Sequence, residues 1–273
     1  MNEPDYLERL DKLWACSHPK LANAKPKELF SPDYVGRYRR LHEDLWWRIV
    51  RVHGTLHTLD QLKAFPFEHL YAPNEMEFWR LVVRNFLDMA CILLHGLLSD
   101  ESANAQTIPR FKNEVIRAPW LDDTKRQLLQ RTLGERKFDK VADSIADRVR
   151  AIRHRRIAHR LRDKEGDAAK EQLAAVSLDE LHRLFNAAHG LFGALCFGSA
   201  YATLAGDLMP CTVGGKPART CLDEILDAVL RDSYFVNRPE RRGHWWPLDR
   251  KHMDPKELEL MNDLRKRVGL PEA

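Results

Sequence analysis

Hydrophobic residues recur along most of this chain at the three- and four-residue spacing of amphipathic α-helices. The clearest early case follows Ser31-Pro32, where a side-chain cap and a proline at the first helical position favour a helix start. From there to Gly54, apolar residues recur at this spacing between Leu41 and Val52. We therefore predict a helix from Pro32 to Gly54.

The same pattern predicts helices along the rest of the chain. Asn74 and Glu77 resemble a capping box, and Ser177 with Glu180 forms an S-x-x-E cap. The further predicted helices cover residues 4–15, 75–98, 107–133 (two short helices around Pro119), 135–159, 177–204, 221–232 and 254–268. No strand-like alternation occurs, so the predicted fold class is all-α, a helical bundle with long helices at its centre.

Composition narrows the classes of protein to which the chain can belong. It has 273 residues, with 44% hydrophobic and 31% charged, which is typical of a soluble globular protein. Five cysteines, an odd number with no C-x-x-C pair, make a disulfide framework improbable. The N-terminus has no apolar signal segment, and the apolar run Phe86–Leu98 is too short and polar to span a bilayer. We expect a cytoplasmic protein without a membrane partner.

Positive charge is concentrated in one segment. The net charge is only +4, so an argument for nucleic-acid binding depends on local clustering. The arginine cluster comprises Arg148, Arg150, Arg153, Arg155, Arg156, Arg160 and Arg162, with His154 and His159 among them. Like charges this dense repel one another, which favours an anionic partner. The alternative is a solvated helix face, partly neutralised by Asp143, Asp147 or Asp163.

Two residues of the cluster have the chemistry needed to cut RNA without a metal. Histidine titrates near neutrality, so His159 can take a proton from a ribose 2′-hydroxyl, and the surrounding arginines favour its neutral form. Arg153 stays charged and matches the oxygens of a crowded phosphorane. Six residues apart on one helix, the two lie about 120° around the axis and roughly 9 Å along it. The helix must therefore loosen, or two copies must meet across a two-fold axis.

The string RHRRIAH at 153–159 resembles the R-x(4–6)-H signature of the HEPN superfamily. The helix from residue 75, followed by SANAQTIPRF, looks like the first core helix and second-helix entry of its abortive-infection, AbiU-type branch. The capped SLDELHRLF helix resembles the last core helix. The resemblance covers about residues 75–205. The implied domains are an N-terminal helical extension (1–74), a HEPN-like core of four to five helices (75–205) and a C-terminal helical, basic-aromatic extension (206–273).

The resemblance also implies an activity. Members of the superfamily often dimerise through the motif helices and act as metal-independent endoribonucleases that leave a 2′,3′-cyclic phosphate. Carried over by position, Arg153 contacts the phosphate, His154 is the accessory polar residue and His159 is catalytic. No cofactor or metal is implied, and the expected role is a phage-defence effector or toxin, with an antitoxin or acidic protein as a possible further partner. The candidate RNA-binding residues are Arg150, Arg155, Arg156, Arg160 and Arg84. The alternative is a helical module that binds RNA or protein without cutting.

Other conspicuous residues have simpler interpretations. Trp245 and Trp246 lie among arginines and histidines, as in an RNA platform, but tryptophans that pin a C-terminal segment are favoured. The spacing of Cys211, Cys221, His244 and His252 matches no zinc module. The Gly214–Lys216 turn lacks P-loop spacing. His95 and His189 are predicted to be core histidines, and Arg80, Arg84 and Asp88 a structural row of ion pairs.

Overall fold

The computed structural model describes residues 19–70, 76–99, 106–136, 146–147, 149–151, 176–197, 212–213, 216–217, 221–233, 236 and 255–272. The described elements are α2 (Pro19–Ala22), α3 (Pro26–Leu29), α4 (Pro32–Ala64), α5 (Phe67–Leu70), α6 (Met76–Leu98), α7 (Ile108–Arg117), α8 (Asp123–Arg136), α11 (Leu178–Ala194), β1 (Thr212–Val213), β2 (Lys216–Pro217), α12 (Cys221–Asp232) and α14 (Pro255–Arg267). The fold is helical, as predicted, apart from the two-residue antiparallel strands β1 and β2. Two compact units are formed, the first by Met1–Leu59 with Phe86–Met209 and the second by Asp60–Asn85 with Pro210–Ala273.

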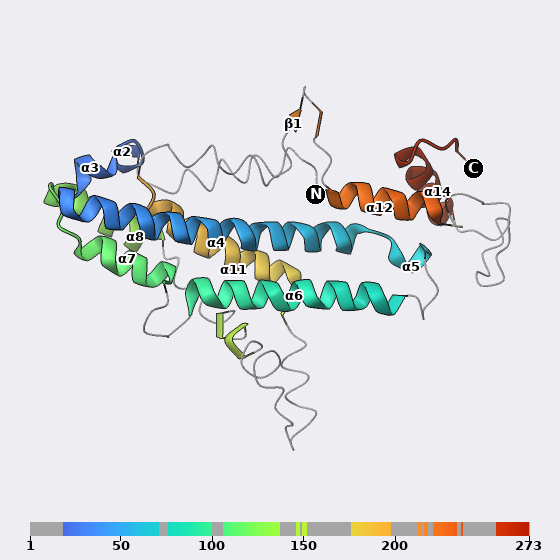
Figure 1. The fold of residues 1–273 in the computed structure, drawn as a ribbon, viewed down its shortest axis with the longest axis horizontal. Helices are drawn as coiled ribbons and strands as arrows, with labels where there is room; N and C mark the ends of the chain where they lie inside the picture. Colours follow the sequence, from blue (N-terminus) through green and yellow to red (C-terminus); the bar gives the residue numbers. More distant parts are fainter. Residues whose placement is uncertain are drawn as a thin grey trace, which may run out of the picture. The chain divides into compact units, whose positions relative to one another are not determined.

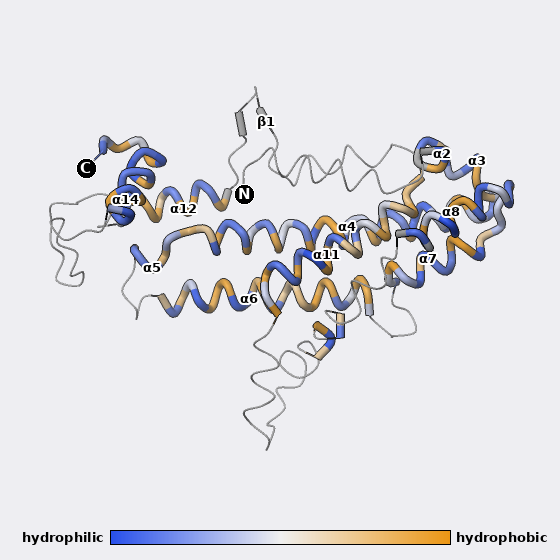
Figure 2. The backbone as a smooth tube through the Cα atoms, turned by 180° about the vertical axis from the view of Figure 1, so that it is seen from behind, coloured by the Kyte–Doolittle hydropathy of each residue, from blue (hydrophilic) through white to orange (hydrophobic). Residues whose placement is uncertain are grey.

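Helix α4 begins at Pro32, as predicted, but continues through Gly54 to Ala64. Its buried residues keep the helical spacing beyond the glycine, and burial of this stripe offsets the roughly 1 kcal/mol that a mid-helix glycine costs relative to alanine. The stripe consists of Tyr38, His42, Leu45, Ile49, Val52, Leu56 and Leu59. Figure 2 shows the resulting alternation of hydrophilic and hydrophobic turns along α4.

In the first unit, α4 packs beside α7 and α11, and α11 also contacts α8 (Figure 1). Backbone hydrogen bonds join the segment before α4 to the turn between α7 and α8. The Ser31 amide donates to the Pro119 carbonyl at 3.0 Å, and the Leu121 amide donates to the Leu29 carbonyl at 2.8 Å. The ring of Phe30 stacks edge-on against Trp120, with centroids 4.7 Å apart. These contacts hold the N-terminal ends of α4 and the C-terminal end of α7 together.

Helix α11 begins at the predicted capping box, in which Ser177 and Glu180 exchange hydrogen bonds of 2.9 and 3.2 Å. It ends at Ala194, ten residues before the predicted end at residue 204. The buried Tyr38 hydroxyl of α4 donates to the Leu195 carbonyl at 2.8 Å and accepts from the Phe197 amide at 3.2 Å. Backbone groups at the end of α11 are thus satisfied by a side chain, so the helix does not need to continue.

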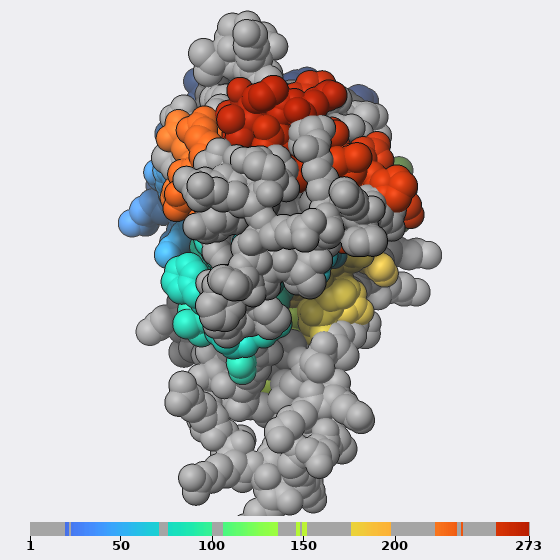
Figure 3. Space-filling view, turned by 90° about the vertical axis from the view of Figure 1, so that its right-hand side faces the viewer, coloured from blue at the N-terminus to red at the C-terminus, as the bar shows by residue number. Residues whose placement is uncertain are grey.

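The second unit contains α12 and α14, whose side chains lie next to one another in Figure 3. Arg267 of α14 donates through Nε to the carboxylate of Asp227 on α12 at 2.7 Å, and Asp227 is only 1% exposed. Gln61, at the end of α4, donates to Asp223 on the same face of α12 at 3.3 Å. Helix α12 has the predicted bounds, and α14 begins at the predicted proline.

Helix α6 is mainly apolar. Within the described ranges it is the one helix whose length and composition would allow it to cross a membrane, a test that core helices of soluble proteins also pass. Phe78, Leu81, Met89 and Ile92 are exposed on it. Of the predicted row of ion pairs, Arg80 pairs with Glu77 at 2.5 Å, and the pairing of Arg84 with Asp88 stays a prediction.

Two further boundaries differ from prediction. Gly134 does not end α8, which continues to Arg136. No helix was predicted between residue 15 and Ser31, but the structure has the single-turn helices α2 and α3 there, each beginning with a proline. The predicted helix at 4–15 lies outside the described residues.

Candidate functional site

The predicted catalytic residues fall outside the described part of the chain. These are Arg153, His154 and His159, together with the RNA-binding candidates Arg155, Arg156 and Arg160. Of the remaining candidates, Arg150 is half-buried in a described helical turn next to the buried Val149, and Arg84 is exposed on α6. The roles assigned to the motif stay predictions.

A basic groove lies between α4 and α7 in the first unit. On α4, Tyr34, Arg37, Leu41, Asp44 and Arg48 recur every three or four residues, so they share one face. On α7 the same spacing brings Arg110, Asn113, Glu114 and Arg117 onto one face. The α4–α7 groove consists of two neighbouring pockets, of about 490 and 540 Å³, that share Arg37.

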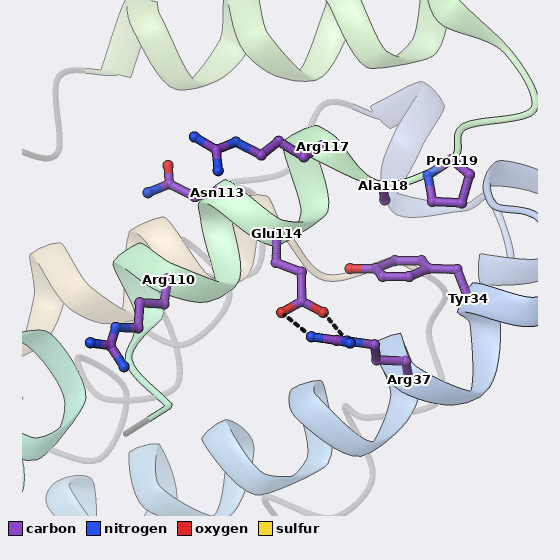
Figure 4. A pocket seen from close by; sticks show the side chains of 8 residues that line it. All are labelled: Tyr34, Arg37, Arg110, Asn113, Glu114, Arg117, Ala118 and Pro119. Carbon is purple, nitrogen blue, oxygen red and sulfur yellow. Dashed lines mark hydrogen bonds and ion pairs between the residues drawn. The ribbon is translucent and has the colours of Figure 1, made fainter. Parts of the chain in front are cut away.

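An ion pair spans the first pocket (Figure 4). Arg37 donates through Nε and Nη2 to the two carboxylate oxygens of Glu114, at 2.5 and 3.1 Å. The hydrogen bond and the charge of Glu114 raise the pKa of Arg37. The arginine side chain is 62% exposed, so solvent screens the pair, and its contribution to stability is small. Its structural effect is to fix one guanidinium at the junction of the two pockets.

Tyr34 lines the same pocket and is nine-tenths buried, with 9% of its surface exposed. Its hydroxyl is buried, and no hydrogen-bond partner for it occurs within the part of the chain that the structure describes. In Figure 4 this hydroxyl is directed towards the space beside Glu114. Burial and the Glu114 carboxylate raise the pKa of Tyr34, against the opposing effect of Arg37. The phenol therefore keeps its proton and is available as a hydrogen-bond donor.

The second pocket continues the groove along α4. Arg48 is held by two acceptors, the Asp44 carboxylate at 3.0 Å and the Gln106 carbonyl at 3.1 Å. Arg40 is exposed and has no ion pair among the described residues. Five arginines, Arg37, Arg40, Arg48, Arg110 and Arg117, therefore line the groove against two carboxylates, Asp44 and Glu114. An excess of positive charge in a concave surface attracts anions.

The groove has no signal in the amino-acid sequence. Its arginines are dispersed over two segments about 70 residues apart in the chain, and no local cluster marks them. The three- and four-residue spacing on α4 and α7 was visible, but which helical faces meet depends on tertiary packing. Only the pairing of α4 with α7 brings the two rows together.

A second polar cluster lies in the core. His42 Nε2 is 3.0 Å from Cys196 Sγ, and this thiol also donates to the Phe192 carbonyl at 3.3 Å. Burial lowers the pKa of His42 to about 4 and raises the pKa of the Cys196 thiol. Both groups are therefore neutral at pH 7, so the pair lacks the thiolate that a cysteine nucleophile requires. We assign it to packing.

The predicted core histidines are confirmed, since His95 and His189 are 6% and 5% exposed. Burial lowers the pKa of His189 to about 4. Within the described ranges, no group of three or more histidine, cysteine, aspartate or glutamate side chains could hold a metal. The side chains of Cys211, Cys221, His244 and His252 lie outside those ranges.

Comparison with known families gives a match over most of the chain. The family described as AbiU2, of the HEPN type, matches residues 31–209. The match begins at the start of α4, earlier than the resemblance at 75–205, and so includes both sides of the α4–α7 groove. The predicted domain boundaries stay a prediction. No curated protein and no solved structure gives a significant match.

Proposed function

This chain belongs to the AbiU2 family of HEPN domains, and from that premise we propose that it is a metal-independent endoribonuclease. The observation that carries the proposal is the RHRRIAH string at 153–159, which has the R-x(4–6)-H spacing and lies inside the matched residues 31–209. It combines a group that can accept a proton at pH 7 with one that stays cationic.

The reaction divides between these two groups. His159 takes the proton of a ribose 2′-hydroxyl, and the 2′-oxygen forms a bond to the adjacent phosphorus. Arg153 stabilises the charge of the phosphorane, with His154 as the accessory polar residue. The bond from phosphorus to the 5′-oxygen breaks, and that oxygen takes up a proton. The products are a 2′,3′-cyclic phosphate and a 5′-hydroxyl.

The proposal includes a homodimer formed through the motif helices. On one continuous helix Arg153 and His159 would lie about 120° apart, so the proposal takes the site as shared between two copies, which would bring them to one phosphate. The exposed Met89 and Ile92 on α6 in the first unit provide apolar surface that an oligomer could cover.

The proposed role is a cytoplasmic phage-defence effector or toxin. Arg150, Arg155, Arg156, Arg160 and Arg84 would contact RNA, and an antitoxin or acidic protein is a further proposed partner. The alternative is a module that uses the same cluster to bind RNA or protein without cutting it. The two differ in whether a 2′,3′-cyclic phosphate is formed.

The test is cleavage of a labelled RNA by the purified chain, with identification of the product ends by mass spectrometry. Wild type is expected to cut in the presence of EDTA, whereas Arg153→Ala and His159→Ala are expected to lose at least 100-fold in rate while keeping the wild-type circular dichroism spectrum. Arg183→Ala, an exposed arginine on α11, is the matched control and is expected to cut normally. Activity abolished by EDTA would overturn the metal-free mechanism.

The same variants test the shared site. Mixing Arg153→Ala with His159→Ala subunits should restore part of the activity, because a mixed dimer can contain one site with both groups intact. RNA binding by wild type without any cleavage would favour the alternative.

A further inference from the structure

We propose that the α4–α7 groove binds successive phosphates of a single RNA strand, through residues other than those of the RHRRIAH motif. The proposal rests on the proposed function only for the choice of RNA as the anion. It depends on the described residues alone, and both sides of the groove belong to the first unit.

The charge of the groove favours an anionic ligand. Of the five arginines in the groove, Arg37 and Arg48 are engaged by Glu114 and Asp44. Arg40 and Arg117 are exposed and make no ion pair within the described ranges. A guanidinium offers a planar fork of donors that matches two oxygens of one phosphate. The groove thus has two guanidinium groups without a described carboxylate partner, next to two that carboxylates hold in place.

The length of the groove favours a chain of phosphates over a single one. From Arg37 to Arg48 the groove follows α4 for 11 residues, which is about 16 Å along the helix axis. On α7, Arg110 and Arg117 are two turns apart, on the same face as Asn113. A row of this length is several times the size of one phosphate group, so it can meet more than one phosphate of a strand. A free mononucleotide would fill only part of it.

The Tyr34 hydroxyl also favours a ligand with acceptor oxygens. Tyr34 lines the first pocket and is only 9% exposed. Its hydroxyl has no hydrogen-bond partner in the described part of the chain. Leaving a buried donor unsatisfied costs about 1–3 kcal/mol. An acceptor oxygen from a bound phosphate, or a water that such a ligand orders, would satisfy it.

The lining also favours RNA over an acidic peptide. Few of its lining residues are apolar: Leu41 in the second pocket, with Ala118 and Pro119 in the first. A peptide needs pockets for apolar side chains to be held specifically. The amides of Asn113 and Gln106 instead suit contacts to phosphate, sugar or base edges.

The experiment uses the full-length His159→Ala variant, which separates binding from cleavage. Fluorescence anisotropy measures binding of a labelled 12-nucleotide single-stranded RNA over a series of salt concentrations. In this background we compare Arg40→Glu/Arg117→Glu with Arg39→Glu. Arg39 is exposed on α4 and lines neither pocket, so its substitution by glutamate reverses a charge on the same helix outside the groove. Competitors are inorganic phosphate, AMP and a poly-glutamate peptide.

We expect the double reversal to weaken RNA binding about tenfold or more at 100 mM salt and to reduce the slope of log K against log salt by about 1.4, which corresponds to two lost phosphate contacts. Arg39→Glu should change affinity less than threefold. Equal RNA affinity in the groove variant and its control would overturn the proposal, as would tighter competition by poly-glutamate or AMP than by unlabelled RNA. Wild type that fails to cut while groove-dependent binding persists refutes the nuclease proposal and leaves this one intact.

Discussion

Tyr34 and Tyr38 lie one turn apart on α4, but their hydroxyls differ in whether they have hydrogen-bond partners. The Tyr38 hydroxyl is buried in the core and makes two hydrogen bonds, to the backbone that ends α11. The Tyr34 hydroxyl is also buried but lines the groove, and the described residues provide it with no partner. Two identical side chains on one helix thus have different roles. Tyr38 stabilises the backbone at the end of α11, and Tyr34 is available to bind a ligand.

The difference extends to the two sides of the helix. On the core side the titratable groups, His42 of α4 and Cys196 beside it, are kept neutral by burial. On the groove side, charges remain in contact with solvent, and Arg37 pairs with Glu114 without being enclosed. Burial therefore separates residues that maintain the structure from residues that can exchange one partner for another.

Acidification should give the largest effect, because it protonates the two histidines that burial keeps neutral in the core. Burial lowers the pKa of His42 and His189 from 6.5 to about 4. Between these values the unfolded chain binds more protons than the folded chain, so stability is fully present above pH 6.5 and is lost as the pH falls towards 4. We expect a loss of roughly 3 kcal/mol for each histidine by pH 4, measured by urea denaturation between pH 7 and 4.

His189→Phe keeps an aromatic ring beside Phe185, on which the histidine stacks at 5.7 Å. It should reduce the pH dependence by about half. A pH dependence unchanged in this variant would contradict the assignment of His189 as a neutral core histidine.

Removal of the Tyr38 hydroxyl should have the next largest effect. Tyr38→Phe keeps the ring but leaves the Leu195 carbonyl and the Phe197 amide without this partner. We expect the free energy of unfolding at pH 7 to fall by about 1–3 kcal/mol, as measured by urea denaturation. A change below 0.5 kcal/mol, by the same scale, would show that other groups satisfy the end of α11.

Tyr34→Phe is the matched substitution on the groove side and should have the smallest effect on stability. Since it removes a buried hydroxyl that has no described partner, the free energy of unfolding should stay equal or rise by up to about 1 kcal/mol. RNA affinity in the His159→Ala background should fall. Destabilisation as large as that of Tyr38→Phe would mean that the hydroxyl has a structural partner.

The sequence predicted helix starts better than helix ends. Caps at Ser177 and the prolines at residues 32 and 255 are local signals, and the structure has helix starts there. Ends depended on tertiary contacts: α4 passes Gly54 because its buried stripe continues, and α11 stops at Ala194 because Tyr38 satisfies its last backbone groups. Neither contact is visible in a linear pattern.

The candidate site divides in a similar way. A motif such as RHRRIAH is contiguous and can be recognised from sequence, together with the family that it indicates. The α4–α7 groove has no contiguous signal, because Arg40 and Arg117 come together only through packing of two helices. Surface charge of this kind becomes informative only when the facing side chains are known.

The reactivity of Cys196, which pairs with His42, can also report how fast the first unit opens. Disulfide exchange and alkylation need a thiolate that a reagent can reach. In the folded core the Cys196 thiol stays protonated and is inaccessible to reagents, since the residue is 8% exposed and its sulfur lies 3.0 Å from the His42 imidazole. Modification of this one sulfur, followed by peptide mass spectrometry, should therefore proceed at the rate at which the end of α11 detaches from α4.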